Sequence, residues 1–199
     1  MKDIHLGLDF DNTIVIYDQL FYDYALKCGY IDKGIEKNKV AIRKELIENN
    51  QEDIFTKMQG VVYGKLIVDA PIQNAMADSI RNIIKMGAKV SIVSHKTKYP
   101  IIGERLDLHK ASMQWLHKNG FFDNSKIGIK ETNVFFEESI EKKISRIHEI
   151  GCTHFVDDLE KVLVRLNDDV DKIQFGCLEK DSKYKVLSKW KDLKMVILN

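Results

Sequence analysis

The sequence predicts an α/β protein: a Rossmann-like, parallel-sheet, three-layer core with a mainly α-helical cap inserted into it. Two observations lead to this class. Short apolar runs that read as buried strands alternate with helical segments along most of the chain, and such alternation is typical of a parallel sheet covered by helices on both faces. In addition, the stretch between the first strand and the next core helix is too long for an ordinary connection and has a helical pattern of its own.

The expected strands are the short apolar runs of the chain. They lie at 4–8, 88–93, 133–136, 154–156, 172–175 and 195–198. The expected helices outside the insertion show apolar residues at helical spacing. One begins at Asp69-Ala70-Pro71, because proline favours the first turn of a helix, and ends before Gly87. The others lie at 107–118, 138–149 and 182–190.

These elements divide the chain into two expected domains. Residues 1–15 and 69–199 form the α/β core, and residues 16–68 form the helical cap. Because the insertion leaves just after the first strand and returns just before the helix at Pro71, both of its linkers lie beside the end of that strand. We therefore expect the cap to fold as a separate subdomain over the carboxyl edge of the sheet.

Composition argues against several classes of function. The chain has 199 residues, 31 basic against 30 acidic, and a net charge of +1, which argues against a nucleic-acid partner. No run approaches the roughly 20 apolar residues of a membrane helix. The three cysteines are odd in number and lack metal-ligand spacing, which favours reduced thiols and a cytoplasmic protein. The oligomeric state has no signature in the sequence.

Two acidic segments are the most informative feature of the chain. Asp9-Phe10-Asp11-Asn12-Thr13 follows the first strand, and Asp157-Asp158 follows the strand at 154–156. Carboxylates at the carboxyl ends of parallel strands project into the crevice where open α/β sheets bind ligands. Converging carboxylates repel one another unless a cation lies among them, and a ligand set made only of oxygen suits Mg²⁺. An aspartate nucleophile beside Mg²⁺ is the chemistry of an aspartyl-phosphate enzyme.

Four short motifs make the sequence resemble the haloacid dehalogenase superfamily, in its phosphatase branch with a C1-type cap. The first motif is Asp-x-Asp-x-Thr, here 9–13. The second is a serine that ends an apolar strand, here Ser94 in Val90-Ser91-Ile92-Val93-Ser94. The third is a lysine near the start of a later helix, and the fourth is the acidic pair at 157–158. All four occur in the family's order.

The resemblance implies a role for each motif. Asp9 is expected to attack phosphorus and form a phospho-aspartate, and Asp11 to act as general acid and then as general base. Mg²⁺ is expected to be held by Asp9, the main-chain oxygen of Asp11 and Asp157, with help from Asp158. Ser94 and the lysine are expected to bind the phosphoryl oxygens.

The lysine has two candidates, Lys142 and Lys143. We prefer Lys143 because apolar residues follow it at the first, fourth and seventh positions, as in the family pattern. Residues beside the motifs are candidates for substrate contacts. Thr13 is expected to hold its loop by hydrogen bonding. His95 is expected either to touch the substrate or to be an exposed or packing histidine. Tyr17 is the best candidate for a substrate contact in an aromatic segment whose spacing otherwise indicates a core-facing helix. Lys96 and Lys98 are expected to receive a second anionic group or to form an exposed basic loop.

The expected function is a Mg²⁺-dependent phosphatase that acts on a small phosphorylated metabolite, because a cap excludes large substrates. A phosphomutase and a nucleic-acid end phosphatase remain open within the enzyme class. A non-catalytic binding module on the same fold is the alternative outside it, although such a protein is expected to have lost Asp9, Asp11 or the acidic pair.

Overall fold

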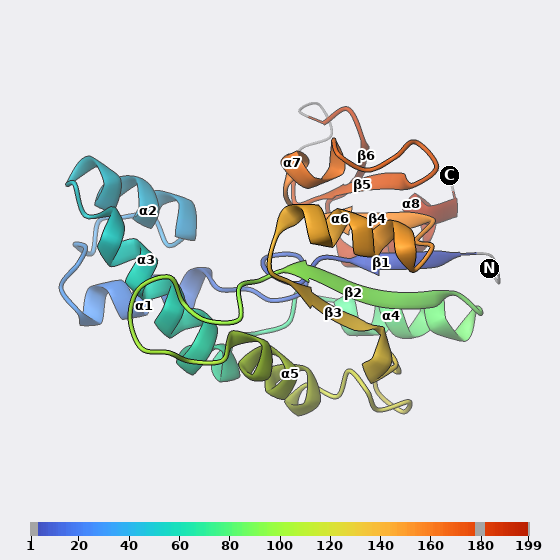
Figure 1. Ribbon diagram of the computed structural model, residues 1–199, viewed down its shortest axis with the longest axis horizontal. Coiled ribbons are helices and arrows are strands. Elements are labelled where there is room, and N and C mark those ends of the chain that lie inside the picture. The colour runs from blue at the N-terminus through green and yellow to red at the C-terminus, as the bar shows by residue number, and fades with distance from the viewer. Residues whose placement is uncertain (1–3, 178–181, 199) are drawn as a thin grey trace. The chain divides into compact units, whose positions relative to one another are not determined.

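The computed structural model describes residues 4–177 and 182–198. They contain one six-stranded sheet, in which every neighbouring pair of strands is parallel and the order is β3-β2-β1-β4-β5-β6 (Figure 1). The strands are β1 (His5–Leu8), β2 (Lys89–His95), β3 (Val134–Glu137), β4 (His154–Asp157), β5 (Asp171–Phe175) and β6 (Lys185–Leu187). This confirms the expected α/β class with a Rossmann-like parallel sheet.

The described chain folds as two compact units. The first comprises Met1–Val15, Ile72–Lys96 and Asn119–Asn199, and the second comprises Ile16–Pro71 and Thr97–Lys118. The helices of the first unit are α4 (Met76–Lys85), η3 (Glu131–Asn133), α6 (Ile140–Glu149), α7 (Glu160–Leu163), η5 (Trp190–Asp192) and α8 (Leu193–Leu198). Those of the second are α1 (Asp18–Lys27), α2 (Lys39–Glu48), α3 (Glu52–Val61), η1 (Val62–Leu66), η2 (Ile67–Asp69) and α5 (Leu108–Lys118).

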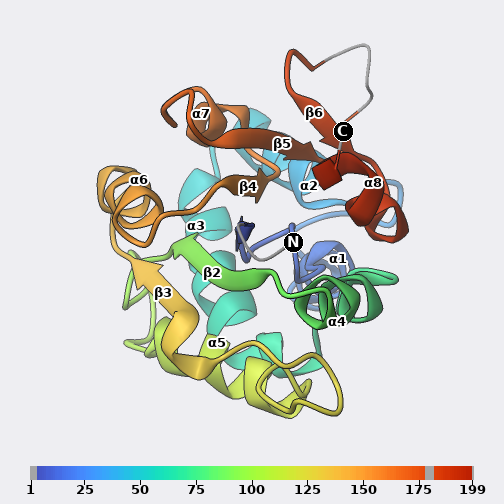
Figure 2. The same ribbon diagram turned by 90° about the vertical axis from the view of Figure 1, so that its right-hand side faces the viewer.

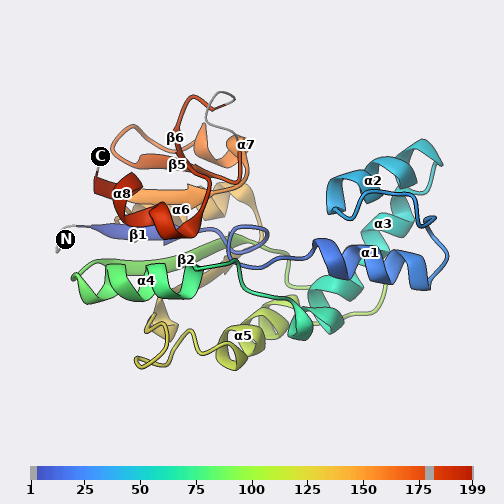
Figure 3. The same ribbon diagram turned by 180° about the vertical axis from the view of Figure 1, so that it is seen from behind.

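The first unit has three layers. Seen along the strands, α6 and α7 lie on one face of the sheet and α4 and α8 on the other (Figure 2). The face covered by α4 and α8 is toward the viewer in Figure 3. The core under α6 and α7 is apolar and includes Phe155 of β4, Ile147 of α6 and Leu163 of α7, all fully buried. Burial on both faces explains why the strands read as nearly continuous apolar runs rather than alternating ones.

The second unit includes a segment that we assigned to the core. Residues 97–118 belong to it, and α5 in this segment packs against η1 and η2. The indole nitrogen of Trp115 donates to the carbonyl of Ala70 at 2.8 Å. Two glycines allow the close approach: a Cβ on Gly60 would lie 2.8 Å from Pro100, and one on Gly64 would lie 2.8 Å from Leu106. The observed division thus differs from the expected one, in which only residues 16–68 stood apart.

The helix expected at Pro71 begins later, at Met76. Ile72 instead forms an antiparallel bridge with Val15, which continues the loop after β1. Ala75, with φ of 61°, then turns the chain into α4 from the left-handed region. Pro71 therefore lies in an extended segment of chain that connects the two units, and not in the first turn of a helix.

Two expectations for the carboxyl-terminal part are wrong. The range 182–190 contains strand β6 rather than a helix, and 195–198 lies in helix α8 rather than in a strand. The backbone of β6 pairs with β5, so a short segment flanked by lysines is used as an edge strand. Leu193 and Ile197 are four residues apart and both buried, which is the helical period within a run that also looks like a strand.

Among the described residues, no helix combines the length and the apolar character that crossing a bilayer requires.

A glycine at the centre of the sheet leads to a stability prediction. Gly7 of β1 faces Phe155 of β4, and a Cβ at Gly7 would overlap that ring and lie 2.8 Å from the sulfur of Cys152. We expect Gly7→Ala to destabilise the fold by about 1–3 kcal/mol, the usual cost of overpacking a core. Urea unfolding measures it, with Gly34→Ala as the matched control, because nothing lies within 4 Å of a Cβ there. Equal stability of the two variants would contradict this packing.

Candidate active site

The candidate site lies at the carboxyl edge of the sheet, at its topological switch point. Strand β1 lies between β2 and β4, so the strand order reverses there, and open α/β sheets bind ligands in the crevice that results. Asp9 follows β1 directly, and its amide donates to the carbonyl of Val156 at 2.9 Å. Asp157 is the last residue of β4. The β1–β4 pairing thus brings together two aspartates that are far apart in the sequence.

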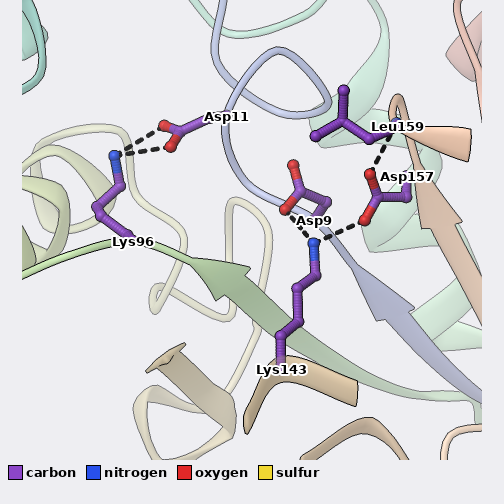
Figure 4. Close-up of polar contacts among 6 residues, drawn as sticks. All are labelled: Asp9, Asp11, Lys96, Lys143, Asp157 and Leu159. Carbon is purple, nitrogen blue, oxygen red and sulfur yellow. Dashed lines mark hydrogen bonds and ion pairs between the residues drawn. The ribbon is translucent and has the colours of Figure 1, made fainter. Parts of the chain in front are cut away.

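Lys143 lies between these two aspartates (Figure 4). Its ammonium nitrogen is 2.6 Å from Oδ1 of Asp9 and 2.6 Å from Oδ2 of Asp157. The other oxygen of Asp157 accepts the amide of Leu159 at 2.8 Å. Asp9, Lys143 and Asp157 are all buried. A buried ammonium group with two carboxylate partners is fixed in position, because leaving any of the three unpaired would be costly.

Helix α6 explains how the lysine reaches this position. Ser139 caps the helix by accepting the amide of Lys142, and Lys143 is in the first turn on the face toward the sheet. The Lys143 ammonium also lies 5.3 Å from the centre of the Phe155 ring. Lys142 is exposed. Of the two candidate lysines, the structure therefore brings Lys143 to the aspartates.

The electrostatics of the site favour a positive charge at its centre. Burial raises the pKa of Asp9 well above its usual range, and Asp157, Asp158 and Asp11 raise it further, while Lys143 opposes them. Burial lowers the pKa of Lys143, but the two carboxylates outweigh this, and the net shift of its pKa is upward. The ammonium form is therefore strongly held, and a negative charge on Asp9 needs compensation beyond that which Lys143 provides.

The donor set fits a hard divalent cation. Carboxylate oxygens of Asp9, Asp157 and Asp158 lie within 4.8 Å of one another. With Asp11, the site brings four acidic side chains together with the two lysines Lys143 and Lys96, so acidic groups are in excess among these residues. A divalent ion would offset that excess, and a cluster of oxygen ligands is the kind that Mg²⁺ prefers.

Asp11 forms an ion pair with Lys96, which we expected to receive a second anionic group or to lie in an exposed loop. The Lys96 ammonium is 2.9 Å from Oδ1 and 2.8 Å from Oδ2 of Asp11 (Figure 4). Lys96 is only 4% exposed, so the expectation of an exposed basic loop is wrong for this residue. A signal existed in the sequence: Lys96 follows the apolar run of β2 just as Asp11 follows that of β1, and neighbouring strand ends place opposite charges side by side.

Two hydroxyl groups at the same edge are buried without a hydrogen-bond partner among the described residues. They belong to Ser94, near the end of β2, and Thr13, in the loop after β1. The hydrogen bond that we expected Thr13 to make to its loop is therefore not seen. An unsatisfied buried polar group costs about 1–3 kcal/mol, so two of them beside the carboxylates are candidates to bind a ligand.

The two remaining candidates for substrate contacts, His95 and Tyr17, differ in their exposure to solvent. His95 is exposed and is the last residue of β2, directly after Ser94. Tyr17 is fully buried in the second unit, where its ring centre lies 4.8 Å from that of Tyr63. Its packing in an aromatic cluster gives no support to a substrate contact, and the amphipathic period of the helix that follows explains why it turns inward.

Comparison with known proteins shows which solved structures share the fold of this chain. Neither a protein-family model nor a curated protein matches the sequence. Solved structures do match the fold along nearly the whole chain. A haloacid dehalogenase-like hydrolase from Streptococcus pneumoniae has a TM-score of 0.63 at 11% identity, with 99% of this chain and 100% of that chain covered. A protein described as a predicted phosphoglycolate phosphatase from Haemophilus somnus has a TM-score of 0.62 at 12% identity, with 99% of each chain covered.

A third structure, described as a predicted phosphatase from Clostridium acetobutylicum, has a TM-score of 0.61 at 12% identity, with 98% of each chain covered. At such low identity these matches establish the fold. The sheet order, the position of the two acidic strand ends and the three matches agree: the chain has the fold of the haloacid dehalogenase superfamily.

Proposed function

We propose that the protein is a Mg²⁺-dependent phosphomonoesterase that acts on a small phosphorylated metabolite through a phospho-aspartate on Asp9. The observation that carries this proposal is the position of Lys143, which lies 2.6 Å from both Asp9 and Asp157 at the switch point of the sheet. That arrangement gives a carboxylate nucleophile, a fixed positive charge and an acidic cation site at one place. Two solved structures with this fold are described as predicted phosphatases.

The chemistry follows from the residues. A carboxylate oxygen of Asp9 attacks phosphorus, and the bond between phosphorus and the ester oxygen breaks. The leaving oxygen takes a proton from the carboxyl group of Asp11. Water then attacks phosphorus of the phospho-aspartate and gives a proton to Asp11, which restores Asp9 and releases inorganic phosphate. Asp11 thereby acts as acid in one step and as base in the next.

Other groups hold the phosphoryl group. Lys143 and the buried hydroxyl of Ser94 offer a positive charge and a donor for its oxygens, and the unpartnered hydroxyl of Thr13 is a further donor. Asp9, Asp157 and Asp158, with the main-chain oxygen of Asp11, would hold Mg²⁺. The ion supplies the charge that lets an anionic carboxylate approach an anionic phosphate.

The substrate class rests on the second unit. The chain enters this unit directly after the loop that carries Asp11 and Thr13, and enters it again after Lys96. Both junctions follow residues of the candidate site, which supports the role of a C1-type cap and a preference for small substrates. One structural neighbour is described as a predicted phosphoglycolate phosphatase. A phosphomutase would share the first half of the reaction, and product analysis distinguishes the two.

Metal removal tests the proposal. Purified protein with Mg²⁺ should release inorganic phosphate from members of a panel of small phosphorylated metabolites, and a chelator should abolish that release. The physical reason is that the site alone has excess negative charge toward a phosphate dianion. Adding Mg²⁺ back should restore the rate, which controls for irreversible loss of protein. Full turnover in the chelator would refute the mechanism, and release from no compound in the panel would refute the substrate class.

A further inference from the structure

Lys96 is a buried charged residue to which the proposed chemistry gives no role. Its side chain is 2% exposed, and its ammonium contacts both carboxylate oxygens of Asp11 at nearly equal distances, 2.9 and 2.8 Å. The ammonium thus holds the carboxylate through both of its oxygens. The side chain of Asp11 is 20% exposed and comes from a tight turn, in which the next residue, Asn12, has φ of 62°. The lysine is therefore the better anchored partner.

The anchoring of Lys96 comes from the sheet. Its amide donates to the carbonyl of Glu137 at 2.8 Å, which continues the pairing of β2 with β3 beyond the end of β2. Its ammonium lies 5.5 Å from the centre of the Phe10 ring, in the loop after β1. Two neighbouring strands thus place the charge. A group held in this way can hold a second group in turn, because a rigid supporting contact is what keeps a reacting side chain in its productive geometry.

The two buried lysines contact different aspartates of the site. Figure 4 shows Lys143 with Asp9 and Asp157, and Lys96 with Asp11 to one side. In the proposed reaction Asp9 carries the bond to phosphorus, and Asp11 carries the proton of the leaving oxygen. We infer that Lys96 is the positioning residue of the general acid–base: it holds the carboxyl group of Asp11 where the leaving oxygen departs. This inference rests on the proposed function. Lys96 itself makes or breaks no bond.

A positioning role has a kinetic signature. If Lys96 acts through Asp11, its loss slows protonation of the leaving oxygen. The resulting decrease in rate is greater for an ester whose leaving group is more basic. If Lys96 instead bound the phosphoryl group, its loss would lower the rates for all esters alike. Aryl phosphates separate the two cases, because p-nitrophenyl and phenyl phosphate differ little in shape while p-nitrophenol is a much stronger acid than phenol.

The test compares Lys96→Met with the wild type in kcat/KM for these two esters, using the full chain with Mg²⁺. The ratio kcat/KM covers binding and cleavage of the ester bond and leaves out later hydrolysis of the phospho-aspartate. We expect the loss to be about tenfold greater for phenyl than for p-nitrophenyl phosphate, part of the roughly 10²–10⁴-fold that acid–base help supplies. Asp11→Asn should show the same pattern more strongly, and Lys96→Met added to Asp11→Asn should cost little more.

Two further variants keep the inference falsifiable. Lys89→Met removes an exposed lysine at the other end of β2 and controls for the loss of a charge. Lys96→Arg keeps the charge and should recover part of the lost rate with phenyl phosphate; it also carries the test if Lys96→Met does not fold. Equal losses for both esters, or full additivity with Asp11→Asn, would overturn the inference. Neither result touches the proposed function, which fails instead if Asp9→Asn keeps its activity.

Discussion

Replacing Asp9 with asparagine should abolish phosphate release while leaving the fold intact. An amide is a poor nucleophile, and no other described carboxylate lies directly after β1 and against Lys143 in the same way. The fold should survive, because Lys143 keeps its 2.6 Å contact with Asp157 in the variant. Single-turnover assays with Mg²⁺ measure the chemical step, and circular dichroism checks the fold.

The variant also has an expected stability. Burial and the neighbouring carboxylates raise the pKa of Asp9, which means that the fold disfavours its negative charge. Without Mg²⁺, Asp9→Asn should therefore unfold at a denaturant concentration no lower than that of the wild type. A folded Asp9→Asn protein that still turns over would refute the nucleophile, and a variant that is strongly destabilised without metal would refute the electrostatic account of the site.

Replacing Lys143 with methionine should have the largest effect on stability. It leaves Asp9 and Asp157 facing each other in a buried place without their shared ammonium group. Removing one partner of a buried ion pair typically costs about 3–5 kcal/mol, because the remaining charge is left uncompensated. Urea unfolding in the presence of a chelator measures this cost. Catalysis should be lost as well, since the phosphoryl group loses its fixed positive charge.

Two controls make the Lys143 result specific. Lys142→Met removes the exposed neighbour on the same helix turn and should change stability by no more than about 0.5 kcal/mol, as is usual for surface sites. Mg²⁺ should stabilise Lys143→Met more than the wild type, because the cation replaces the missing charge between the same carboxylates. If Lys143→Met and Lys142→Met were equally stable in chelator, the buried pairing would be refuted.

Much of the fold was predictable because its signals are local. Strands buried on both faces must be apolar along their length, so β1, β2 and β4 stand out as continuous apolar runs. Helix α6 has its isoleucines at helical spacing and Ser139 as its cap. Strand β6 and helix α8 lacked such signals. Strand β6 has only three residues and is recognisable only by its pairing with β5, and α8 is a run of apolar residues that suits either state.

The residues of the candidate site also differ in how far the sequence alone predicts their positions. Asp9 and Asp157 were predictable because strand ends place them at one edge, and Lys143 because of the apolar residues that follow it. The burial of Lys96 was not predicted, although Lys96 follows β2 just as Asp11 follows β1, because a lysine just beyond a strand usually extends into solvent. Only its position opposite Asp11 on a neighbouring strand gives it a partner. The burial of Tyr17 has a local signal in the amphipathic helix that it precedes, but its partner Tyr63 lies far along the chain and has none.

The central place of β1 in the sheet has a consequence for the folding of the nascent chain. Strand β1 comes first in the chain among the strands of this sheet and pairs with β2 on one side, but its other neighbour, β4, begins at His154. Asp9 and Lys143 are separated by 134 positions. At about 5–20 residues per second, roughly 7–30 s pass between the synthesis of the aspartate and that of its partners. Until then the apolar edge of β1 that β4 will cover stays open. The site thus cannot form before β4 has been synthesised, and a ribosome-bound chain cut short before β4 should show neither its activity nor its metal affinity.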